Sequence, residues 1–354
     1  MNYIGSKLSL LPFLEKSINQ IVDKDCKIFC DLFAGTGIVG THFKKKGYKI
    51  IANDLQYYSY VLNKQYIDNH EELEFNGLVA EIPDLQNINI ADRKDKVCFY
   101  LSNMAGKKGF IYQNYSLSGT KGKEFERLYF SDENAKKCDA LRDKIQDWSD
   151  SKKINEKEYF FLLASLLEVV DKHANTASVY GAFLKEMKKS AQKVFSLIPA
   201  NLIINEQAHK VFNEDANSLI KKIETDILYL DPPYNERQYC SNYHILETIA
   251  KNDKPLMFGK TGLRDYKKQK SEYCSKRTVR NAFEDLILNA KARYIFLSYN
   301  NEGLLSLDDV KEIMSQKGKY GFFTQGYNRF KADKNRNYKT NKTVEYLHYC
   351  ICDK

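Results

Sequence analysis

The feature that most limits how this 354-residue chain can fold is a glycine-rich turn between two short apolar strands. Lys27 to Leu32 is predicted to form a strand, residues 37–46 a helix, and Tyr48 to Asn53 a second strand. A strand, a glycine turn, a helix and a strand make a βαβ unit, in which the strands are parallel and the crossover is right-handed. The beginning of the chain is therefore predicted to belong to an α/β sheet.

A long segment of different character interrupts this pattern. Eight aromatic residues lie between residues 99 and 130 among lysines and glycines, and helical periodicity follows over Asp132–Trp148 and 156–174. We see no internal repeat and no low-complexity tract. Residues 75–204 are therefore predicted to form a mostly helical insertion.

Strands return after residue 204. A buried apolar strand is expected at Thr225–Leu230, another at Ala292–Tyr299, and a late pair around Phe322–Phe323 and Val344–Ile351. Together with the first 74 residues they predict one doubly wound, Rossmann-like α/β sheet that the insertion splits. The expected domains are thus residues 1–74 with 205–354, and residues 75–204.

Composition narrows the class of protein. No apolar run reaches about 18 residues and the first residues lack the apolar stretch of a signal peptide, so we expect neither a membrane span nor export. The eight cysteines and six histidines show no metal-ligand spacing, which predicts reduced thiols in a cytoplasmic protein without a metal. The formal net charge of +9 fits a polyanionic partner.

The glycine turn itself allows two cofactors. Gly35, Gly37 and Gly40 spell the dinucleotide fingerprint, and Asp54 follows where a ribose-binding carboxylate belongs, so a nicotinamide oxidoreductase is a competing hypothesis. A pyrophosphate disfavours nearby anions, however, and Asp31 stands at the end of the first strand. S-adenosylmethionine brings an ammonium and a sulfonium, which a carboxylate there would attract. This segment alone favours the methyl donor only moderately.

The tetrad Asp231-Pro232-Pro233-Tyr234 follows a buried apolar strand, where an α/β sheet presents its ligand crevice. The exocyclic nitrogen of adenine is a poor nucleophile, because its lone pair is delocalised into the ring. Two acceptors on its N–H bonds, the Asp231 carboxylate and the Pro232 carbonyl, would rehybridise it. The prolines fix the backbone and offer no competing N–H, while Tyr234 offers a flat face to a base flipped out of the duplex. A proline turn that merely caps the strand is the plainer alternative.

These motifs, in this order, resemble the D12 class (Dam-like) of adenine-N6 DNA methyltransferases. The resemblance extends over nearly the whole chain. It covers an amino-terminal motif, Tyr3-x-Gly5-Ser6-Lys7, a cofactor loop, Asp31-x-Phe33-x-Gly35-x-Gly37, and the catalytic tetrad. The order of cofactor loop, long insertion and tetrad is similar to the family's alpha arrangement, in which the insertion recognises the target sequence. Segments around Asn175–Gly181 and Asn235–Tyr239 are similar to the branch found beside restriction endonucleases.

The resemblance implies roles for individual residues and partners. It implies an enzyme that methylates N6 of adenine in a short sequence of double-stranded DNA, with S-adenosylmethionine as cofactor and a restriction endonuclease as a partner in some relatives. Cofactor binding is implied for Tyr3, Lys7, Asp31, Phe33, Gly35, Gly37, Asp54 and Asp215, and catalysis for Asp231, Pro232, Pro233 and Tyr234. Tyr3 stands where relatives often have tryptophan. An unstructured terminus is the plainer alternative for Tyr3 and Lys7, and an acidic turn residue for Asp215.

Two basic segments are candidates for contact with DNA. Residues 327–342 carry six basic side chains against one acid, with aromatics between them, which suits phosphates and stacking. A second candidate is the loop around residues 116–123, and a solvated basic loop is the alternative for both. The proposed DNA-binding residues are Lys121, Lys123, Arg329, Lys331, Lys334 and Arg336. His244 is expected near the pocket mouth or packed as a structural histidine.

The sequence therefore predicts an S-adenosylmethionine-dependent methyltransferase with a helical target-recognition insertion. Three other hypotheses remain. Methylation of the N4 amino group of cytosine needs the same nitrogen geometry, methylation of RNA or protein usually goes with asparagine in place of Asp231, and an oxidoreductase leaves the tetrad unexplained. The recognition sequence and the oligomeric state cannot be inferred from one chain.

Overall fold

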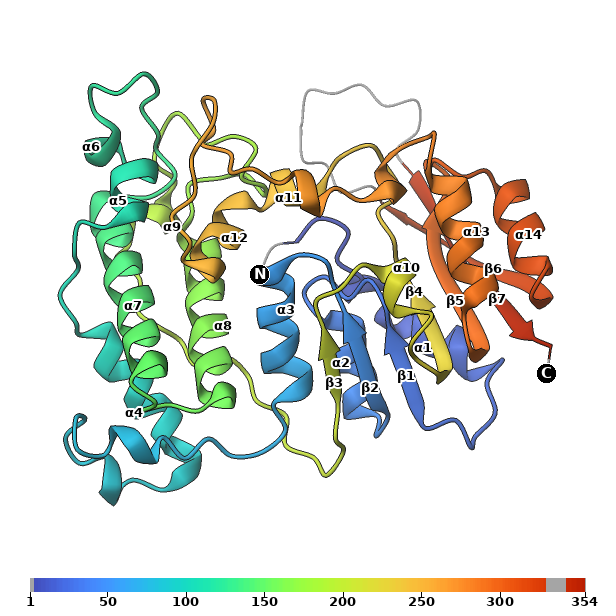
Figure 1. Ribbon diagram of the computed structural model, residues 1–354, viewed down its shortest axis with the longest axis horizontal. Coiled ribbons are helices and arrows are strands. Elements are labelled where there is room, and N and C mark those ends of the chain that lie inside the picture. Colours follow the sequence, from blue (N-terminus) through green and yellow to red (C-terminus); the bar gives the residue numbers. More distant parts are fainter. Residues whose placement is uncertain (1–2, 329–341, 354) are drawn as a thin grey trace. The chain divides into compact units, whose positions relative to one another are not determined.

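The computed structural model describes residues 3–328 and 342–353, which divide into two compact units. We call them the sheet unit and the helical unit (Figure 1). The sheet unit consists of Gly5–Asn63, Gln207–Cys240 and the chain from Lys267 onward. The helical unit consists of Lys64–Glu206 and Ser241–Tyr266, together with the residues up to Ile4.

The sheet unit is built on seven strands in the order β3-β2-β1-β4-β5-β7-β6. Their bounds are Ile28–Asp31 (β1), Lys49–Asn53 (β2), Lys210–Phe212 (β3), Thr225–Leu230 (β4), Ala292–Asn300 (β5), Gly318–Asn328 (β6) and Lys342–Cys352 (β7). The strands from β3 to β5 pair in parallel, and β7 runs antiparallel to both β5 and β6. This arrangement confirms the predicted doubly wound α/β sheet.

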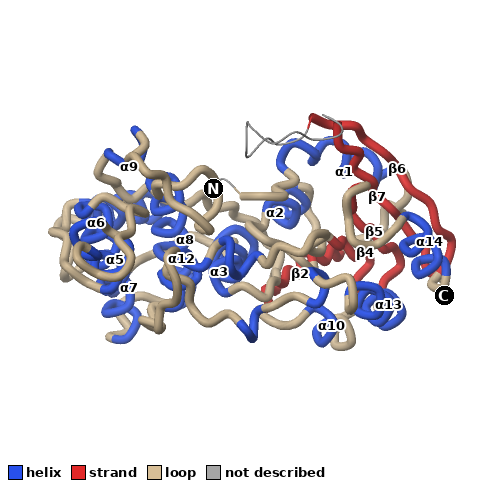
Figure 2. The backbone as a smooth tube through the Cα atoms, turned by 90° about the horizontal axis from the view of Figure 1, so that it is seen from above, coloured by secondary structure: helices blue, strands red, loops and turns tan. Residues whose placement is uncertain are grey.

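Helices cover both faces of this sheet, as Figure 2 shows. One face of β1, β4 and β5 carries Cys30, Leu228 and Ile295, which share a buried apolar cluster with residues of α10 (Ala216–Leu219), α13 (Val279–Asn289) and α14 (Leu307–Ser315). On each strand, the residues directly before and after these three point to the opposite face of the sheet, since side chains alternate along a strand. On that face Phe29 stacks on Phe43 of α2 (Ile38–Lys45) at 4.1 Å between ring centroids, and α1 (Leu11–Asn19) lies beside α2.

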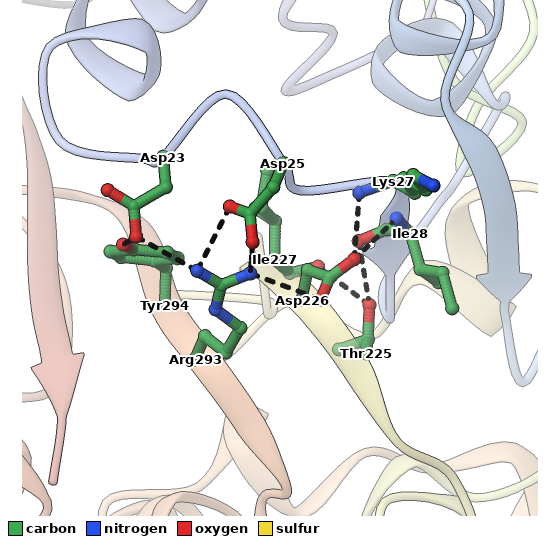
Figure 3. A network of polar contacts seen from close by, with 9 residues as sticks. All are labelled: Asp23, Asp25, Lys27, Ile28, Thr225, Asp226, Ile227, Arg293 and Tyr294. Carbon is green, nitrogen blue, oxygen red and sulfur yellow. Dashed lines mark hydrogen bonds and ion pairs between the residues drawn. The ribbon is translucent and has the colours of Figure 1, made fainter. Parts of the chain in front are cut away.

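A polar network closes the amino-terminal edge of the sheet unit (Figure 3). Arg293 on β5 bridges the carboxylates of Asp23 and Asp25 at 2.9 and 3.1 Å. Asp226 on β4 accepts the backbone N–H groups of Lys27 and Ile28 at the start of β1. The ion pairs are solvent-exposed and contribute little stability, so the network serves mainly to fix the loop that enters β1.

The helical unit is organised around two long neighbouring helices, α7 (Asp132–Asp150) and α8 (Glu156–His173). Its shorter elements are η2 (Lys64–Asp68), η3 (Asn76–Leu78), η4 (Leu85–Asn87), α4 (Ile90–Ser102), α5 (Phe110–Tyr115), α6 (Leu117–Thr120), α9 (Lys189–Gln192) and α12 (His244–Lys251). Asn155 starts α8 with a capping box that Glu158 completes. Between residues 75 and 204, all of which are described, no strand forms.

The other short elements of the described residues are η1 (Leu8–Leu10), α3 (Tyr57–Asn63), α11 (Tyr239–Asn242), η5 (Lys267–Gln269) and η6 (Glu272–Cys274). None of the helices in the described ranges has the length and apolarity that a membrane crossing requires. All eight cysteines are free thiols, seven of them buried.

Candidate active site

The candidate site lies where the strand order of the sheet unit reverses. The chain passes from β1 outward to β2, whereas β4 continues on the other side of β1 to β5. Ligands of open α/β sheets bind outside the carboxyl ends of the strands at such a switch point. Asp31 is the last residue of β1, and Asp231 directly follows β4. The fold thus brings together two carboxylates that are far apart in the sequence.

The glycine turn after β1 has a left-handed backbone geometry that glycine adopts without strain. Gly35 and Gly37 have φ angles of 52° and 77°, a left-handed region that side chains disfavour. Asp54 accepts the Gly35 N–H at 2.9 Å, and the Asn63 side chain donates to the Gly35 carbonyl at 3.0 Å. Gly37 directly precedes α2. The turn is therefore fixed from both sides, so its backbone is preorganised for close approach of a ligand.

Asp31 is a buried carboxylate with an unfavourable environment for its charge. It is 1% exposed and accepts one hydrogen bond, from the Gly40 N–H at 3.0 Å. The pKa of Asp31 is raised to about 8, chiefly by burial; the Gly40 N–H opposes this shift, and the nearby Asp231 and Asp54 carboxylates add to it. Such a group gains from a cationic ligand, because a nearby positive charge favours the ionised carboxylate.

Asp231 is held by a lysine from the beginning of the chain. The Lys7 ammonium lies 3.0 Å from Asp231 Oδ1 and 3.0 Å from Glu345 Oε1 on β7. The pKa of Asp231 is raised to about 6: burial raises it most, the Lys7 ammonium lowers it, and the Glu345 carboxylate raises it. Burial alone would lower the pKa of Lys7, but attraction to Asp231 and Glu345 outweighs burial and holds that pKa well above its ordinary value.

The rest of the tetrad has a defined setting in the sheet unit. The Tyr234 ring lies under the Lys7 ammonium, 5.7 Å from its centroid, and packs edge-on against Tyr299 at 6.2 Å. The Tyr234 carbonyl accepts the Leu304 N–H at 3.1 Å. Pro232 is buried and Pro233 partly exposed, and all described peptide bonds are trans. The tetrad is thus fixed by residues from two distant segments of the chain, Lys7 and residues 299–304.

The remaining cofactor candidates are placed as follows. Asp54 also accepts the Gln56 N–H at 2.8 Å, on the carboxylate oxygen that does not bind Gly35. Phe33 packs edge-on against Tyr273 at 5.1 Å. Asp215 is exposed and caps α10 by accepting the Ser218 N–H, so it does act as the acidic turn residue that the sequence allowed.

Tyr3 and Lys7 belong to different units. Lys7 is 5% exposed, which rules out an unstructured segment at that position. Tyr3 lies in the helical unit, where its ring stacks on Tyr243 at 4.8 Å, and the following Ile4 N–H donates to the Tyr243 hydroxyl. The structure therefore groups Lys7 with Asp231 and places Tyr3 with the helical unit.

The DNA candidates are only partly within the described residues. Arg329, Lys331, Lys334 and Arg336 lie outside them. Lys121 and Lys123 are exposed in the helical unit, and Lys123 donates to the Gln113 carbonyl at 2.6 Å. His244 is fully buried, and its two ring nitrogens contact the Ser241 and Thr261 carbonyls. It is thus a packed structural histidine, which was one of the two expectations.

Glu345 is the site residue that the sequence did not reveal. It is 1% exposed and accepts a hydrogen bond from the Ser298 hydroxyl at 2.7 Å in addition to the Lys7 ammonium. A glutamate within the apolar strand Val344–Ile351 was a signal, because an inward-facing charge in a strand needs a partner. The partner itself stands at the other end of the chain, so no local pattern identified it.

The charges at this edge of the sheet discriminate between cofactors. Three carboxylates, those of Asp31, Asp54 and Asp231, interact electrostatically there. This acidic set fits a ligand with an ammonium and a sulfonium, and it disfavours a pyrophosphate. Within residues 3–328 and 342–353 no group of three or more metal-ligating side chains occurs.

Comparisons with known proteins agree with this geometry. Residues 3–313 match the family described as D12 class N6 adenine-specific DNA methyltransferase. The chain is 51% identical over 352 residues to the type II methyltransferase M.NlaIII of Neisseria lactamica, with 98% of each chain covered. It is 40% identical to M.FokI of Planomicrobium okeanokoites, covering 99% of this chain but about half (52%) of that protein. It is 38% identical to M.CviAII of Paramecium bursaria Chlorella virus 1, covering 94% and 93% of the two chains.

Proposed function

Because this chain belongs to the D12 class of N6 adenine-specific DNA methyltransferases, we propose that it transfers a methyl group from S-adenosylmethionine to N6 of adenine within a short sequence of double-stranded DNA. We further propose that it is the modification enzyme of a restriction-modification system with a partner endonuclease, as the names of its relatives suggest. The observation that carries the proposal is the pairing of Asp231 with Lys7 beside the buried Asp31.

The cofactor would be held at the carboxyl ends of β1 and β2. Asp31 would receive the ammonium, and Asp54 the ribose hydroxyls. Gly35 and Gly37 allow the backbone to approach the nucleoside closely. Phe33, Asp215 and Tyr3 keep the roles that the family resemblance implies, with Asp215 accepting from the adenine amino group of the cofactor.

Asp231 would act on the target base as a hydrogen-bond acceptor. Its carboxylate and the Pro232 carbonyl would each accept one N6–H, which draws the nitrogen lone pair out of the ring system. When bound, the cofactor supplies an electrophilic methyl carbon on a sulfonium sulfur. N6 would form the new bond to that carbon as the bond between the carbon and sulfur breaks, and the sulfur would leave as a neutral thioether. N6 would then release one proton, which the Asp231 carboxylate would accept. Tyr234 would stack on the flipped base.

Lys7 would orient the catalytic carboxylate rather than contact the cofactor alone. Its ammonium reaches Asp231 Oδ1 at 3.0 Å, so the other oxygen, Oδ2, is the one left to face the adenine amino group. Fixing one oxygen in this way sets the direction of the acceptor, and preorganised acceptors are the main source of electrostatic catalysis.

Contacts with DNA would come from both units. Lys121 and Lys123 in the helical unit and Arg329, Lys331, Lys334 and Arg336 in the basic loop would neutralise phosphates, and the insertion would read the target sequence.

The direct test is to incubate the purified protein with tritiated S-adenosylmethionine and plasmid DNA and to analyse the nucleosides by mass spectrometry. We expect N6-methyladenine, and sequencing of DNA from an expressing host should give one short motif. N4-methylcytosine, methylated RNA alone, or calorimetric binding of NAD instead of S-adenosylmethionine would each contradict the proposal. Resistance of the modified plasmid to a nuclease with the same motif would support the restriction-modification role.

A further inference from the structure

The buried charges around Asp231 are unequal in number. The single ammonium of Lys7 lies 3.0 Å from each of two carboxylates, Asp231 and Glu345, and all three side chains are at most 18% exposed. Glu345 Oε1 accepts from both Lys7 and the Ser298 hydroxyl, whereas Oε2 is buried without a hydrogen-bond partner among the described residues. A buried charge with an unsatisfied oxygen costs several kcal/mol and calls for an explanation.

The chemistry of the reaction explains why a second carboxylate is buried beside Lys7. In the proposed methyl transfer, positive charge develops on N6 beside Asp231, and an adjacent ammonium opposes that charge. With Lys7 and Asp231 alone the group would be neutral. With Glu345 included, the group carries a net charge of −1, so Lys7 can hold the carboxylate in place without cancelling its field. Low local polarity strengthens this effect.

We infer that Glu345 is a positioning residue for methyl transfer: it anchors the Lys7 ammonium and offsets its charge, so that Asp231 faces the adenine amino group as an oriented acceptor within a group of net negative charge. Glu345 itself touches neither substrate nor cofactor in this scheme. The inference rests on the proposed function.

The charged and titratable groups facing Asp231 define the controls. They are Lys7 ahead of η1, Glu345 on β7, Asp31 on β1 and Tyr229 on β4. Glu345→Gln keeps an oxygen for Lys7 and Ser298 but removes the charge. Ser298→Ala removes the hydrogen bond but keeps the charge. Lys7→Met together with Glu345→Gln removes both members of the offsetting pair.

The experiment is single-turnover methyl transfer by the full chain between pH 5 and 8, with plasmid DNA. For Glu345→Gln we expect the plateau of the pH–rate profile to be roughly 10-fold lower than in the wild type. The acid limb of that profile should shift to lower pH by about one unit, because a like charge near Asp231 is gone. Ser298→Ala should keep the wild-type limb. Lys7→Met alone should move the limb to higher pH, and the double variant should return it toward the wild type.

A merely structural Glu345 would lower stability or the fraction of active protein without moving the pH profile. An unchanged plateau and limb in folded Glu345→Gln, checked by thermal unfolding, would overturn the inference. If Glu345→Gln did not fold, the acid limbs of Lys7→Met and of the double variant would test the inference instead. Acid limbs at the same pH in these two variants would overturn the inference. A wild-type protein that fails to methylate adenine would overturn the proposed function instead.

A separate observation concerns a hairpin in the helical unit, residues 252–266. Phe258 and Leu263 exchange both backbone hydrogen bonds, at 2.7 and 2.9 Å. Four consecutive carbonyls at its tip, those of residues 259–262, each contact a buried polar side chain. Arg127 donates to Gly259 and Lys260, Tyr115 donates to Gly262, and His244 Nε2 lies 3.1 Å from the Thr261 carbonyl. These three side chains are at most 7% exposed, so the hairpin is rigidly fixed.

This rigid tip presents apolar side chains to water. Leu256 is 80% exposed and Phe258 55%. Lys254 and Lys260 stand on either side of them, and no acidic residue lies between these two lysines. Preordering removes the entropy cost that exposed apolar side chains in a flexible loop would incur on binding. Lysines beside apolar side chains match phosphates beside bases or thymine methyl groups.

We propose that this hairpin contacts the DNA duplex, with Leu256 and Phe258 against the bases and Lys254 and Lys260 on the phosphates. It lies outside residues 75–204, where target recognition was expected. This proposal also rests on DNA being the substrate, and it is independent of Glu345.

The test compares two double variants by fluorescence anisotropy on a mixed-sequence duplex at several salt concentrations. Leu256→Ala/Phe258→Ala should weaken binding about 10-fold, as loss of roughly 1.4 kcal/mol of apolar contact implies, with an unchanged salt slope. Lys254→Ala/Lys260→Ala should reduce the slope of log K against log salt by roughly two. Phe99→Ala, 64% exposed in the same unit, is the matched control. Wild-type DNA binding by both variants, or a change confined to self-association, would overturn the proposal.

Discussion

Buried polar groups serve opposite purposes in the two units. In the helical unit two buried charged groups are satisfied: Asp139 accepts three backbone N–H groups, from Gly109, Ile111 and Tyr112, and Arg142 donates to the carbonyls of Ile249 and Ala250. In the sheet unit Asp31 has one protein donor, and Glu345 keeps an unsatisfied oxygen. The comparison indicates that the helical unit uses buried polarity to fix its loops, whereas the sheet unit leaves charge available for chemistry.

The largest expected effect distinguishes the two ends of one strand. Asp231→Ala should lower methyl transfer by a factor of about 10³ or more, because it removes an oriented acceptor from the reacting nitrogen. Asp226→Ala, at the other end of β4, loses two backbone partners and should cost roughly 1–2 kcal/mol of stability with activity retained. Tritium incorporation and denaturant unfolding measure the two. Comparable activities would contradict the assignment of Asp231.

A second comparison sets two buried carboxylates against each other. Asp139→Ala leaves three backbone N–H groups without their acceptor and should lower the free energy of unfolding by roughly 3 kcal/mol. Asp31→Asn should behave differently, because the pKa of Asp31 is about 8 in the folded protein and near 4 in the unfolded chain. Between these values the folded state binds the extra proton, so this group makes the wild type less stable as pH rises.

The stability of Asp31→Asn relative to the wild type should therefore increase from pH 5 to pH 8. Denaturant unfolding at four pH values measures this difference. A difference that is constant or falls with pH would show that Asp31 is already stabilised as a carboxylate, and the contrast between the units would fail.

Cofactor binding tests whether the carboxylates of the sheet unit are available to a ligand. Asp54→Ala should weaken S-adenosylmethionine binding by roughly 1–3 kcal/mol, the cost of unpaired ligand hydroxyls. For the wild type, binding an ammonium beside Asp31 should lower its pKa and release a proton between pH 6 and 8. Calorimetry in buffers of different ionisation enthalpy detects that proton. Asp31→Asn should bind more weakly and release none, and an unchanged proton count would refute the role.

The smallest expected effect separates phosphate contact from sequence reading. Lys331→Ala/Lys334→Ala should weaken binding equally on all duplexes and reduce the salt slope by roughly two. Substitution of Gln113, Asn114 or Lys121 should instead change which sites are methylated. Gln113 and Lys121 are exposed, whereas the Asn114 amide donates to the Phe110 carbonyl, so Asn114 should have the weakest effect. A changed site preference with an unchanged salt slope in the lysine variant would reverse these roles.

The sequence by itself determined the elements and motifs whose signals are local. β4 spans Thr225–Leu230 as predicted, because an apolar run that ends at Asp-Pro is marked at both ends. The glycine turn, α7, α8 and the late strand pair were also predicted within a few residues. The family match confirms the resemblance that these motifs indicated and excludes an oxidoreductase.

The tertiary structure alone decided which distant residues meet. Lys7 and Glu345 stand at opposite ends of the chain, and the position of β7 between β5 and β6 brings Glu345 to the Lys7 ammonium that pairs with Asp231. Residues 241–266 follow the tetrad in sequence yet belong to the helical unit, where Arg127 and His244 hold their hairpin. The physical reason is that periodicity and turn chemistry act over a few residues, whereas ion pairs between strands depend on topology and register.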